Sequence, residues 1–261
     1  MTSNTRHVAT TSVVICATLC LIFVMVVRPH GSRPDSTQPP SPPKASGRRQ
    51  GPGPSFDEIK KHFPKVDYDA PESADSVERT KRREKGKHYD KGYISTRPTN
   101  HSSSLESEWD FNLPEFPVQQ SDAVLIGKTL SGGAFISPDK TGVYTELSLK
   151  VEEVLYTDRD SLTNDRTIAI SRMGGIVRYQ TGDESLFRIV GQNMPTVGKR
   201  YLFFLKAIPN SDDFQIVTGY ELSPSSVIAL DDPMQFRKQN GRDVTDVIQA
   251  AKSAVQQKRS N

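Results

Sequence analysis

Cysteine is nearly absent from this chain of 261 residues, and its placement is informative. The sequence holds two cysteines, Cys16 and Cys20, and both lie in one apolar run near the N-terminus. The region that follows therefore has no disulfide, no thiolate nucleophile and no zinc site built on cysteine.

Histidine is missing from the C-terminal half as well. All five histidines (His7, His30, His62, His88 and His101) precede residue 115. From that point on, no imidazole is available for general-base chemistry or a Ser-His pair. Gly132-Gly133 and Gly174-Gly175 are isolated doublets that open no helix, so no phosphate-binding loop is present. The sequence thus predicts no catalytic, cofactor-binding or metal-ligating residues.

A strong excess of one charge is also lacking. The formal net charge is +3, to which residues 28–114 contribute +3, residues 115–240 contribute −3 and the two ends of the chain contribute the remaining +3. Neither value is extreme enough to indicate a nucleic-acid partner.

One long apolar run stands out, because Val8 to Val27 contains no charge and Arg6 and Arg28 bracket it. At 1.5 Å per residue, a helix of this length spans about 30 Å, the hydrocarbon thickness of a bilayer. We expect residues 8–27 to be an uncleaved anchor in the lipid bilayer. A cleaved secretory signal, with its shorter core and small residues at the cleavage site, and a buried soluble helix are the alternatives.

The orientation of this anchor rests on two opposing signals. Arg28, Arg33 and Lys44 follow the run, which by the positive-inside rule favours a cytoplasmic C-terminal side. A short N-terminal tail before a long C-terminal region is instead the layout of a signal anchor. We expect a single-pass protein of the bacterial inner membrane with its C-terminal domain in the periplasm.

Four regions follow from composition. Residues 1–27 form the tail and anchor, and residues 28–114 form a linker, Pro-rich at first and then charged, that we expect to be largely disordered. Thirteen of the 18 prolines lie between Pro29 and Pro117, and such a segment buries too little apolar surface to order its chain. Within it, Ala74 to Lys87 is compatible with a charged helix. Residues 115–240 form a β domain, and residues 241–261 form a helix and tail.

The β domain is predicted from eight short strands separated by Gly, Pro, Asn and Asp. Apolar side chains alternate from Val143 to Tyr156, which indicates a half-buried strand with a bulge near Glu152-Glu153. Tyr201 to Leu205 is continuously apolar and so indicates a strand buried on both faces. The pattern favours a small antiparallel barrel or sandwich. The strands are expected at residues 122–130, closed by Ser131-Gly132-Gly133, and at 143–156, 167–171, 176–179, 185–190, 200–208, 214–220 and 227–230.

After Asn240 the apolar period changes to that of a helix, with Val244, Val247 and Val255 on one face and Asp243 as the cap. We expect this amphipathic helix to pack across an open end of the barrel. A partner-binding or membrane-surface helix is the alternative.

Carboxylates are the remaining candidates for chemistry. Glu146 and Glu152 share one strand face and Asp183-Glu184 occupy a turn, so a carboxylate pair for glycoside hydrolysis is conceivable. A solvated sheet face explains the same residues. Asp158 to Asp160 and Asp212-Asp213 are candidates for calcium, although the dense ligand loop of a calcium-binding hand is missing. The basic run Lys81 to Lys87 is either a solvated helix face or turn, or a site for anionic lipid headgroups or polyanions.

Several segments resemble an uncharacterised family of bacterial membrane-anchored envelope proteins with a single small β domain. The residues that carry the resemblance are Ser121 to Lys128, Tyr144-Thr145-Glu146, Val151 to Leu155, Gly174-Gly175, Pro195 to Leu205 and Thr218 to Leu222, together with the upstream region Arg82-Arg83 to Tyr89-Asp90. The resemblance covers roughly residues 70–232. The opening strand and barrel pattern also resemble the OB-like barrel of tissue metalloproteinase inhibitors and netrin modules. The N-terminal cysteine with which those inhibitors bind zinc has no counterpart here, so that activity does not carry over.

These patterns together predict a mainly β, OB-like domain held at a membrane, most simply a non-enzymatic binding or structural module of the cell envelope. An envelope protein or a polysaccharide is the expected partner. A carboxylate-dependent hydrolase and a module that recruits partners through its C-terminal helix are the alternatives. The last of these predicts that deletion of residues 243–261 leaves folding intact.

Overall fold

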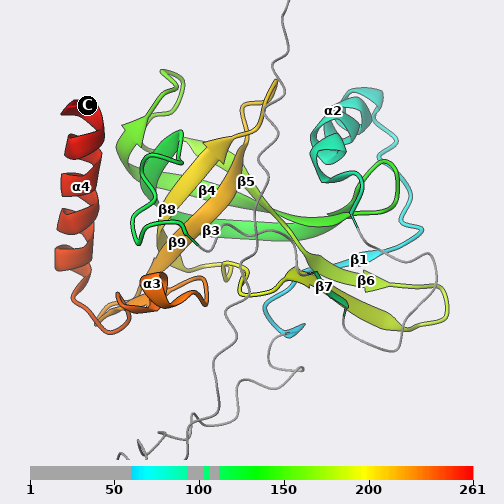
Figure 1. The fold of residues 1–261 in the computed structure, drawn as a ribbon. Helices are drawn as coiled ribbons and strands as arrows, with labels where there is room; N and C mark the ends of the chain where they lie inside the picture. The colour runs from blue at the N-terminus through cyan, green and yellow to red at the C-terminus, as the bar shows by residue number, and fades with distance from the viewer. Residues whose placement is uncertain (1–59, 93–102, 106–111, 261) are drawn as a thin grey trace, which may run out of the picture. The chain divides into compact units, whose positions relative to one another are not determined.

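Five strands form the centre of the fold in the computed structural model, which describes residues 60–92, 103–105 and 112–260 (Figure 1). Apolar residues at every second position give β4, β5 and β9 a face for the core, and β8 and the first part of β3 are continuously apolar. The strands are β3 (Ala123–Ile136), β4 (Val143–Thr157), β5 (Thr167–Met173), β8 (Arg200–Ala207) and β9 (Phe214–Leu222).

These strands follow one another around a nearly closed ring. The order is β9-β5-β4-β3-β8, and β8 pairs with β9 again. All neighbours are antiparallel except β5 and β9, which are parallel and joined through only two residue pairs, Ile170 with Phe214 and Ser171 with Gln215. This short pairing, the β5–β9 seam, is the thinnest closure of the ring. The mainly β, antiparallel class predicted from sequence is confirmed.

The interior of the ring is filled with aliphatic and aromatic side chains. Each ring strand contributes residues to one buried cluster, among them Leu125, Leu147, Ile170, Phe203 and Phe214. The residues between them, such as Val124, Leu202 and Phe204, point to the outside and are buried as well. Strand β8 is therefore buried on both faces, as its continuous apolar run predicts.

All eight predicted strands are present, and the long β4 bends where expected. The pairing between β3 and β4 shifts register between Ile126 and Gly127, which leaves Glu152 without an opposite residue. One boundary is wrong, because β3 does not end at Ser131-Gly132-Gly133 but continues to Ile136. Gly132 lies within the strand and close to its neighbour rather than in a turn, since a Cβ on it would lie 2.5 Å from Leu147 Cδ2.

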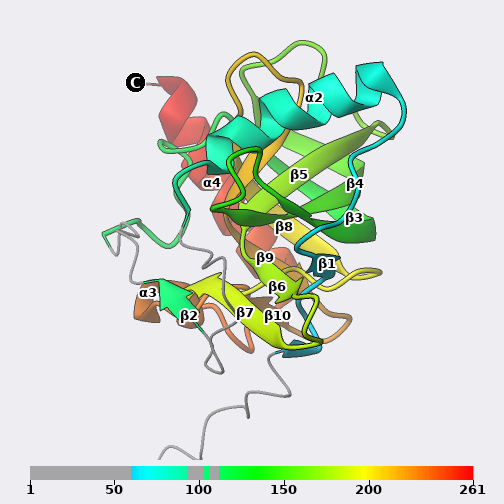
Figure 2. The same cartoon turned by 90° about the vertical axis from the view of Figure 1, so that its right-hand side faces the viewer.

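A second, smaller sheet lies below the ring in Figure 2. Its order is β1-β6-β7-β2, and β1 and β2 pair with their neighbours in parallel. Gly174, at φ +120°, is the residue that turns the chain out of β5 into this sheet. The strands are β1 (Lys65–Asp67), β6 (Gly175–Arg178), β7 (Glu184–Ile189) and β2 (Ser103–Leu105).

The C-terminal helix α4 (Val244–Ser260) covers one outer face of the ring (Figure 1). The Asp243 carboxylate accepts hydrogen bonds from the amides of Thr245 and Asp246, as its predicted capping role requires. Val247, Ala251 and Val255 are buried against the outward side chains of β3, β8 and β9. The helix thus packs against the outside of the ring, and the prediction that it closes an open end is wrong. The short α3 (Met234–Arg237) and β10 (Val227–Ala229) border the same cluster.

A second helix covers a different outer face, and it comes from the predicted linker. Residues 76–86 form α2 (Ser76–Gly86), and the 3-10 turn η1 (Lys87–Tyr89) follows it directly. In Figure 2, α2 runs across the strands β4 and β5. The helix was expected between Ala74 and Lys87, but a largely disordered linker over residues 28–114 is wrong for residues 60–92. The domain begins well before residue 115.

The predicted anchor at residues 8–27 and the Pro-rich part of the linker lie outside the described residues. Among the helices of residues 60–92 and 112–260, none is long and apolar enough to cross a membrane.

Candidate functional site

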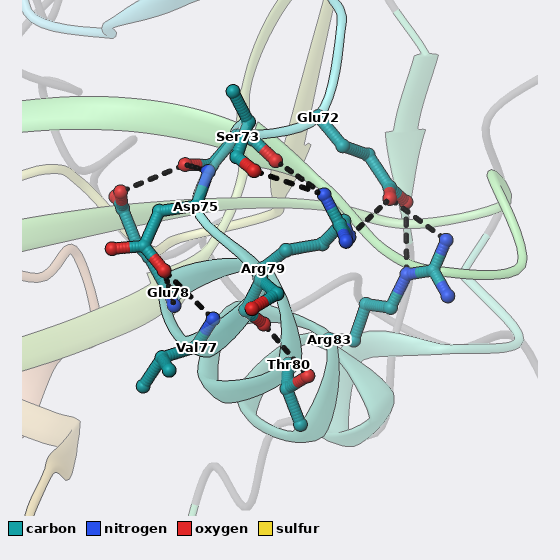
Figure 3. A network of polar contacts seen from close by, with 10 residues as sticks. Glu72, Ser73, Asp75, Val77, Glu78, Arg79, Thr80 and Arg83 are labelled. Carbon is teal, nitrogen blue, oxygen red and sulfur yellow. Dashed lines mark hydrogen bonds and ion pairs between the residues drawn. The ribbon is translucent and has the colours of Figure 1, made fainter.

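The helix α2 is built mostly from its own polar side chains. Asp75 caps its first turn by accepting from Val77 N at 2.8 Å. Figure 3 shows Arg79 and Arg83 both directed at Glu72, and Arg83 donates to its two oxygens at 3.0 and 2.7 Å. These pairs are about half exposed, so each contributes little to stability. They shape the helix but do not attach it to the sheet.

Attachment begins at Lys85, the last long side chain of α2. Its ammonium lies 2.5 Å from Glu146 Oε2 on β4 and 2.5 Å from Asp213 Oδ2, just before β9. The three side chains are only 7%, 21% and 9% exposed. Because both oxygens contact one nitrogen, the two carboxylates lie no more than about 5 Å apart. The sequence gives no local sign of this grouping.

A second attachment point follows one helical turn later. The Tyr89 ring stacks on Tyr144 of β4, with centroids 4.3 Å apart and planes at 9°, and its hydroxyl donates to Ser171 Oγ at 2.8 Å. Burial raises the pKa of Tyr89 well above its usual value, an effect that the Ser171 bond partly offsets. Burial raises the pKa of Tyr144 to about 12. Both rings therefore keep their protons and serve as stacking surfaces rather than as bases, and the Tyr89 hydroxyl also serves as a hydrogen-bond donor.

The segment 82–89 also lies close to the backbone of the β3–β4 region. A Cβ on Gly86 would lie 2.8 Å from Pro138 Cδ, and one on Gly142 would lie 2.0 Å from Tyr89 O. Arg82 places its guanidinium 3.8 Å from the centre of the Phe135 ring. Residues 82–89 thus fit closely on the outer face of β4 and β5. We call residues 76–92 the strap, and we call the surface formed by Phe135, Tyr144, Glu146, Ser171 and Asp213 the strap face.

The strap also crosses the β5–β9 seam. Ser171, which accepts from Tyr89, lies in one of its two residue pairs, and His88 Nε2 lies 3.2 Å from Oε1 of the paired Gln215. Beside the strap, an open cavity of about 570 Å³ extends along β4 and is lined by Glu146, Ser148 and Asp213. The strap face therefore continues into a groove that the strap leaves open.

The C-terminal end of the strap is held by the turn between β3 and β4. Asp139 accepts from Ser137 Oγ, from the amide and hydroxyl of Thr141, and from Lys91 N at 2.7 Å. Burial alone would raise the pKa of Asp139, but these four hydrogen bonds outweigh it and hold the pKa well below its usual value. The facing Asp90, which accepts from Asp139 N, has its pKa raised by burial.

These shifts predict a specific response to acid. A carboxyl group whose pKa is lowered by folding adds stability above its unfolded pKa of about 4, and that stability is lost as the pH falls through the folded value. We expect Asp139→Asn to lower the thermal midpoint at pH 7 and the difference from the unmodified chain to shrink progressively below pH 4. Midpoints by circular dichroism between pH 2.5 and 7 test this. A difference independent of pH would contradict it.

The carboxylates singled out in the sequence do not come together as expected. Glu152 pairs with Arg200 at 2.6 Å, and Glu184 pairs with Lys65 at 2.8 Å. Asp183 accepts from Thr181. Glu146 instead joins a cluster with Asp213, which the sequence suggested for calcium, and Lys85 lies between the two. Within the described residues, no group of three or more His, Cys, Asp or Glu side chains is placed to hold a metal ion.

Two histidines reach the domain despite preceding residue 115. His88 lies in the strap, and His62 Nδ1 lies 3.3 Å from Thr196 Oγ1. The prediction that the β domain contains no imidazole is therefore wrong, because residues 60–92, which include His62 and His88, are part of this domain. No local signal marks either contact, since His62 and Thr196 are 134 residues apart.

A buried ion pair lies behind the seam, and the sequence did not suggest it. Arg172 and Asp231 form two hydrogen bonds, at 2.7 and 2.9 Å, with side chains 2% and 0% exposed. Arg172 also donates to the carbonyls of Asn193 and Val217, and Asp231 also accepts from Thr218 Oγ1. The pair joins β5, β9 and the segment after β10, so its role is to hold the ring together.

Comparison with known proteins adds no further assignment. No family model matches the chain, and no curated protein matches it. The resemblance to bacterial envelope proteins stays a prediction from sequence.

Proposed function

We propose that the chain is a membrane-anchored, extracytoplasmic binding module of the cell envelope, without enzymatic activity. The single observation that supports this best is the strap face. It gathers an aromatic platform, a hydroxyl and two carboxylates on the outside of a sheet, and it already binds a peptide segment, the strap. A surface that selects side chains in this way has the composition of a recognition surface.

The strand order supports an OB-like interpretation of the ring. Its first three strands, β3, β4 and β5, form a meander, while β8 returns beside β3 and β9 beside β5. Barrels of the OB class bind their ligands on the outer face of the second and third strands and on the loops between strands one and two and strands four and five. Here these correspond to β4, β5, residues 137–142 and residues 208–213, which surround the strap face.

Charge favours a protein or polysaccharide as the partner over nucleic acid. The strap face itself carries Glu146 and Asp213, and residues 115–240 have a net charge of −3. A phosphate backbone requires a basic surface instead. Anchoring through residues 8–27 in the inner membrane, with the domain in the periplasm, completes the proposal.

Crosslinking from the groove beside the strap tests this function. A photo-reactive residue in place of Ser148, which lines the groove, is expected to capture an envelope component in intact cells. The matched control is the same residue in place of Thr181, which is exposed on the β6–β7 turn. Equal capture from both positions, or capture from neither, would contradict the proposal. A reporter fused after Asn261 tests the export separately, and activity restricted to a cytoplasmic reporter would reverse the location.

A carboxylate-dependent hydrolase is the second candidate, because one oxygen of Glu146 and one of Asp213 lie at most about 5 Å apart, near the spacing of about 5–5.5 Å in a retaining glycosidase pair. Lys85 fills the space between them, where a scissile bond would have to lie. The purified protein is expected to leave glycosides and peptides intact. Hydrolysis that Glu146→Ala abolishes would establish the enzyme and remove the binding module.

A further inference from the structure

We propose that the strap face recognises a peptide segment with an ammonium side chain one helical turn before an aromatic one, and that the strap is a displaceable occupant of this site. The inference rests on the proposed binding function and gives it a ligand chemistry and a regulation. Residues 82–89 of the chain are the template, since their contacts define what the site selects.

Two anchors determine the specificity. The paired carboxylates of Glu146 and Asp213 hold one ammonium with their side chains mostly buried, and a neutral or acidic side chain at that position leaves two like charges facing each other. The Tyr144 ring and Ser171 Oγ hold a phenol four residues later in the bound segment. A helical turn brings residues four apart onto one face, so both anchors are filled together.

Helix α2, the longer part of the strap, is held like a bound ligand rather than like core structure, and Tyr89 is the one aromatic anchor that follows it, at 1% exposure. Of the eleven residues of α2, only Lys85 and Gly86 are buried, and Val77 is 76% exposed. By contrast, α4 buries three apolar side chains in the ring's outer cluster. Segments held by few apolar contacts are the ones that open at low free energy.

Both ends of the strap are tied to the domain, so its release is local. Strand β1 pairs with β6 on the N-terminal side, and β2 pairs with β7 on the C-terminal side. Lys91, at the end of the strap, has φ 61°, a left-handed conformation that is unfavourable for lysine. Release of the strap relieves this strain. A tethered occupant has an effective concentration of about 1 mM, so a free peptide at micromolar concentration does not replace it in the unmodified chain.

The proposed occupant in the cell is a basic, tyrosine-bearing segment of another protein. Negative charge at one anchor excludes an acidic peptide and a phosphate group. An apolar helix is also excluded, because it has neither the ammonium nor the phenol that the strap face binds. The backbone of the bound segment must in addition pass close to Gly142. A second copy of this chain carries the same template, and the experiment separates that case.

The test uses the purified full-length protein in detergent and a labelled synthetic peptide with the sequence of residues 76–92. The release variant is Lys85→Glu with Tyr89→Ala, which changes the strap and leaves the strap face intact. We expect the affinity of the peptide for this variant to be at least about 100-fold higher than its affinity for the unmodified chain. A peptide carrying the same two substitutions is the control and is expected not to bind. Glu146→Lys in the release variant is expected to abolish binding.

Each result supports or opposes the proposal. No binding to a folded release variant at millimolar peptide, or equal binding of the control peptide, would overturn it. Dimers of the unmodified chain that Lys85→Glu abolishes would show exchange of the strap between copies and would overturn the heterologous partner. If the release variant does not fold, Tyr89→Phe and Lys85→Gln replace it. Each is expected to give a smaller gain in peptide affinity, and no gain from either opposes the proposal.

The outcome is distinguishable from that of the proposed function. Capture of an envelope component from Ser148 without peptide binding would leave the binding module in place and remove only the peptide chemistry. Peptide binding without any capture would establish the site and remove the envelope role.

Discussion

Asp231→Ala is expected to lower the free energy of unfolding by about 3–5 kcal/mol, the cost of leaving a buried charge without its partner. The guanidinium of Arg172, 2% exposed, would keep its bonds to two backbone carbonyls but lose both bonds to the carboxylate. Thr218 and the amide of Asn193 would lose an acceptor as well. Denaturation of the purified protein by guanidinium chloride, followed by circular dichroism, measures the change.

The next residue provides a matched control. Asp232 pairs with Arg237 at the surface, with side chains 46% and 54% exposed, so Asp232→Ala is expected to cost less than about 1 kcal/mol. The double variant Arg172→Met, Asp231→Leu removes both charges and is expected to be at least about 1 kcal/mol more stable than Asp231→Ala. Similar losses for Asp231→Ala and Asp232→Ala would contradict the role given to the buried pair.

Local sequence patterns were sufficient to predict the strands, but not to predict which surfaces of the fold contact one another. The alternation in β4, the continuous apolar run of β8 and the cap at Asp243 are each written in consecutive residues, and the structure confirms all three. A strand that pairs on two sides and packs on two faces must be apolar throughout, so β8 was recognisable from composition alone.

The strap was missed as part of the domain for the opposite reason. Its anchors are polar, and they meet partners far away in sequence, 61 residues for Lys85 with Glu146 and 82 for Tyr89 with Ser171. A segment with many charges and few apolar residues has the composition of a disordered linker, even where its pattern is compatible with a helix. What orders it is a set of complementary groups on a distant sheet, and those become visible only after the ring has formed.

The two helices therefore cover the ring in different ways. Helix α4 is attached through apolar side chains that are part of the core, whereas the strap is attached through an ammonium and a phenol over the β5–β9 seam. We infer that a partner which displaces the strap also removes the groups that bridge this two-residue pairing. Recognition at the strap face is in this way coupled to the thinnest closure of the ring.

Whether α4 is a fixed part of the core can be tested by mutation, because a helix that recruits partners must have its apolar face free. Val247 is fully buried between α4 and the outward side chains of the ring. A carboxylate has no partner there, so Val247→Asp is expected to lower the free energy of unfolding by about 3 kcal/mol or more. Denaturation by guanidinium chloride measures it.

Gln249→Asp places the same charge on the exposed face of the same helix and is expected to change stability by less than about 0.5 kcal/mol. Lys258 reinforces the attachment, since its ammonium donates to the carbonyls of Val118 and Ser121, ahead of β3. Deletion of residues 243–261 is therefore expected to unfold the domain. If α4 were instead a free helix that recruits partners, the domain would stay folded after this deletion. Equal stability of Val247→Asp and Gln249→Asp would favour the recruiting helix and would require the outer cluster to hold together without α4.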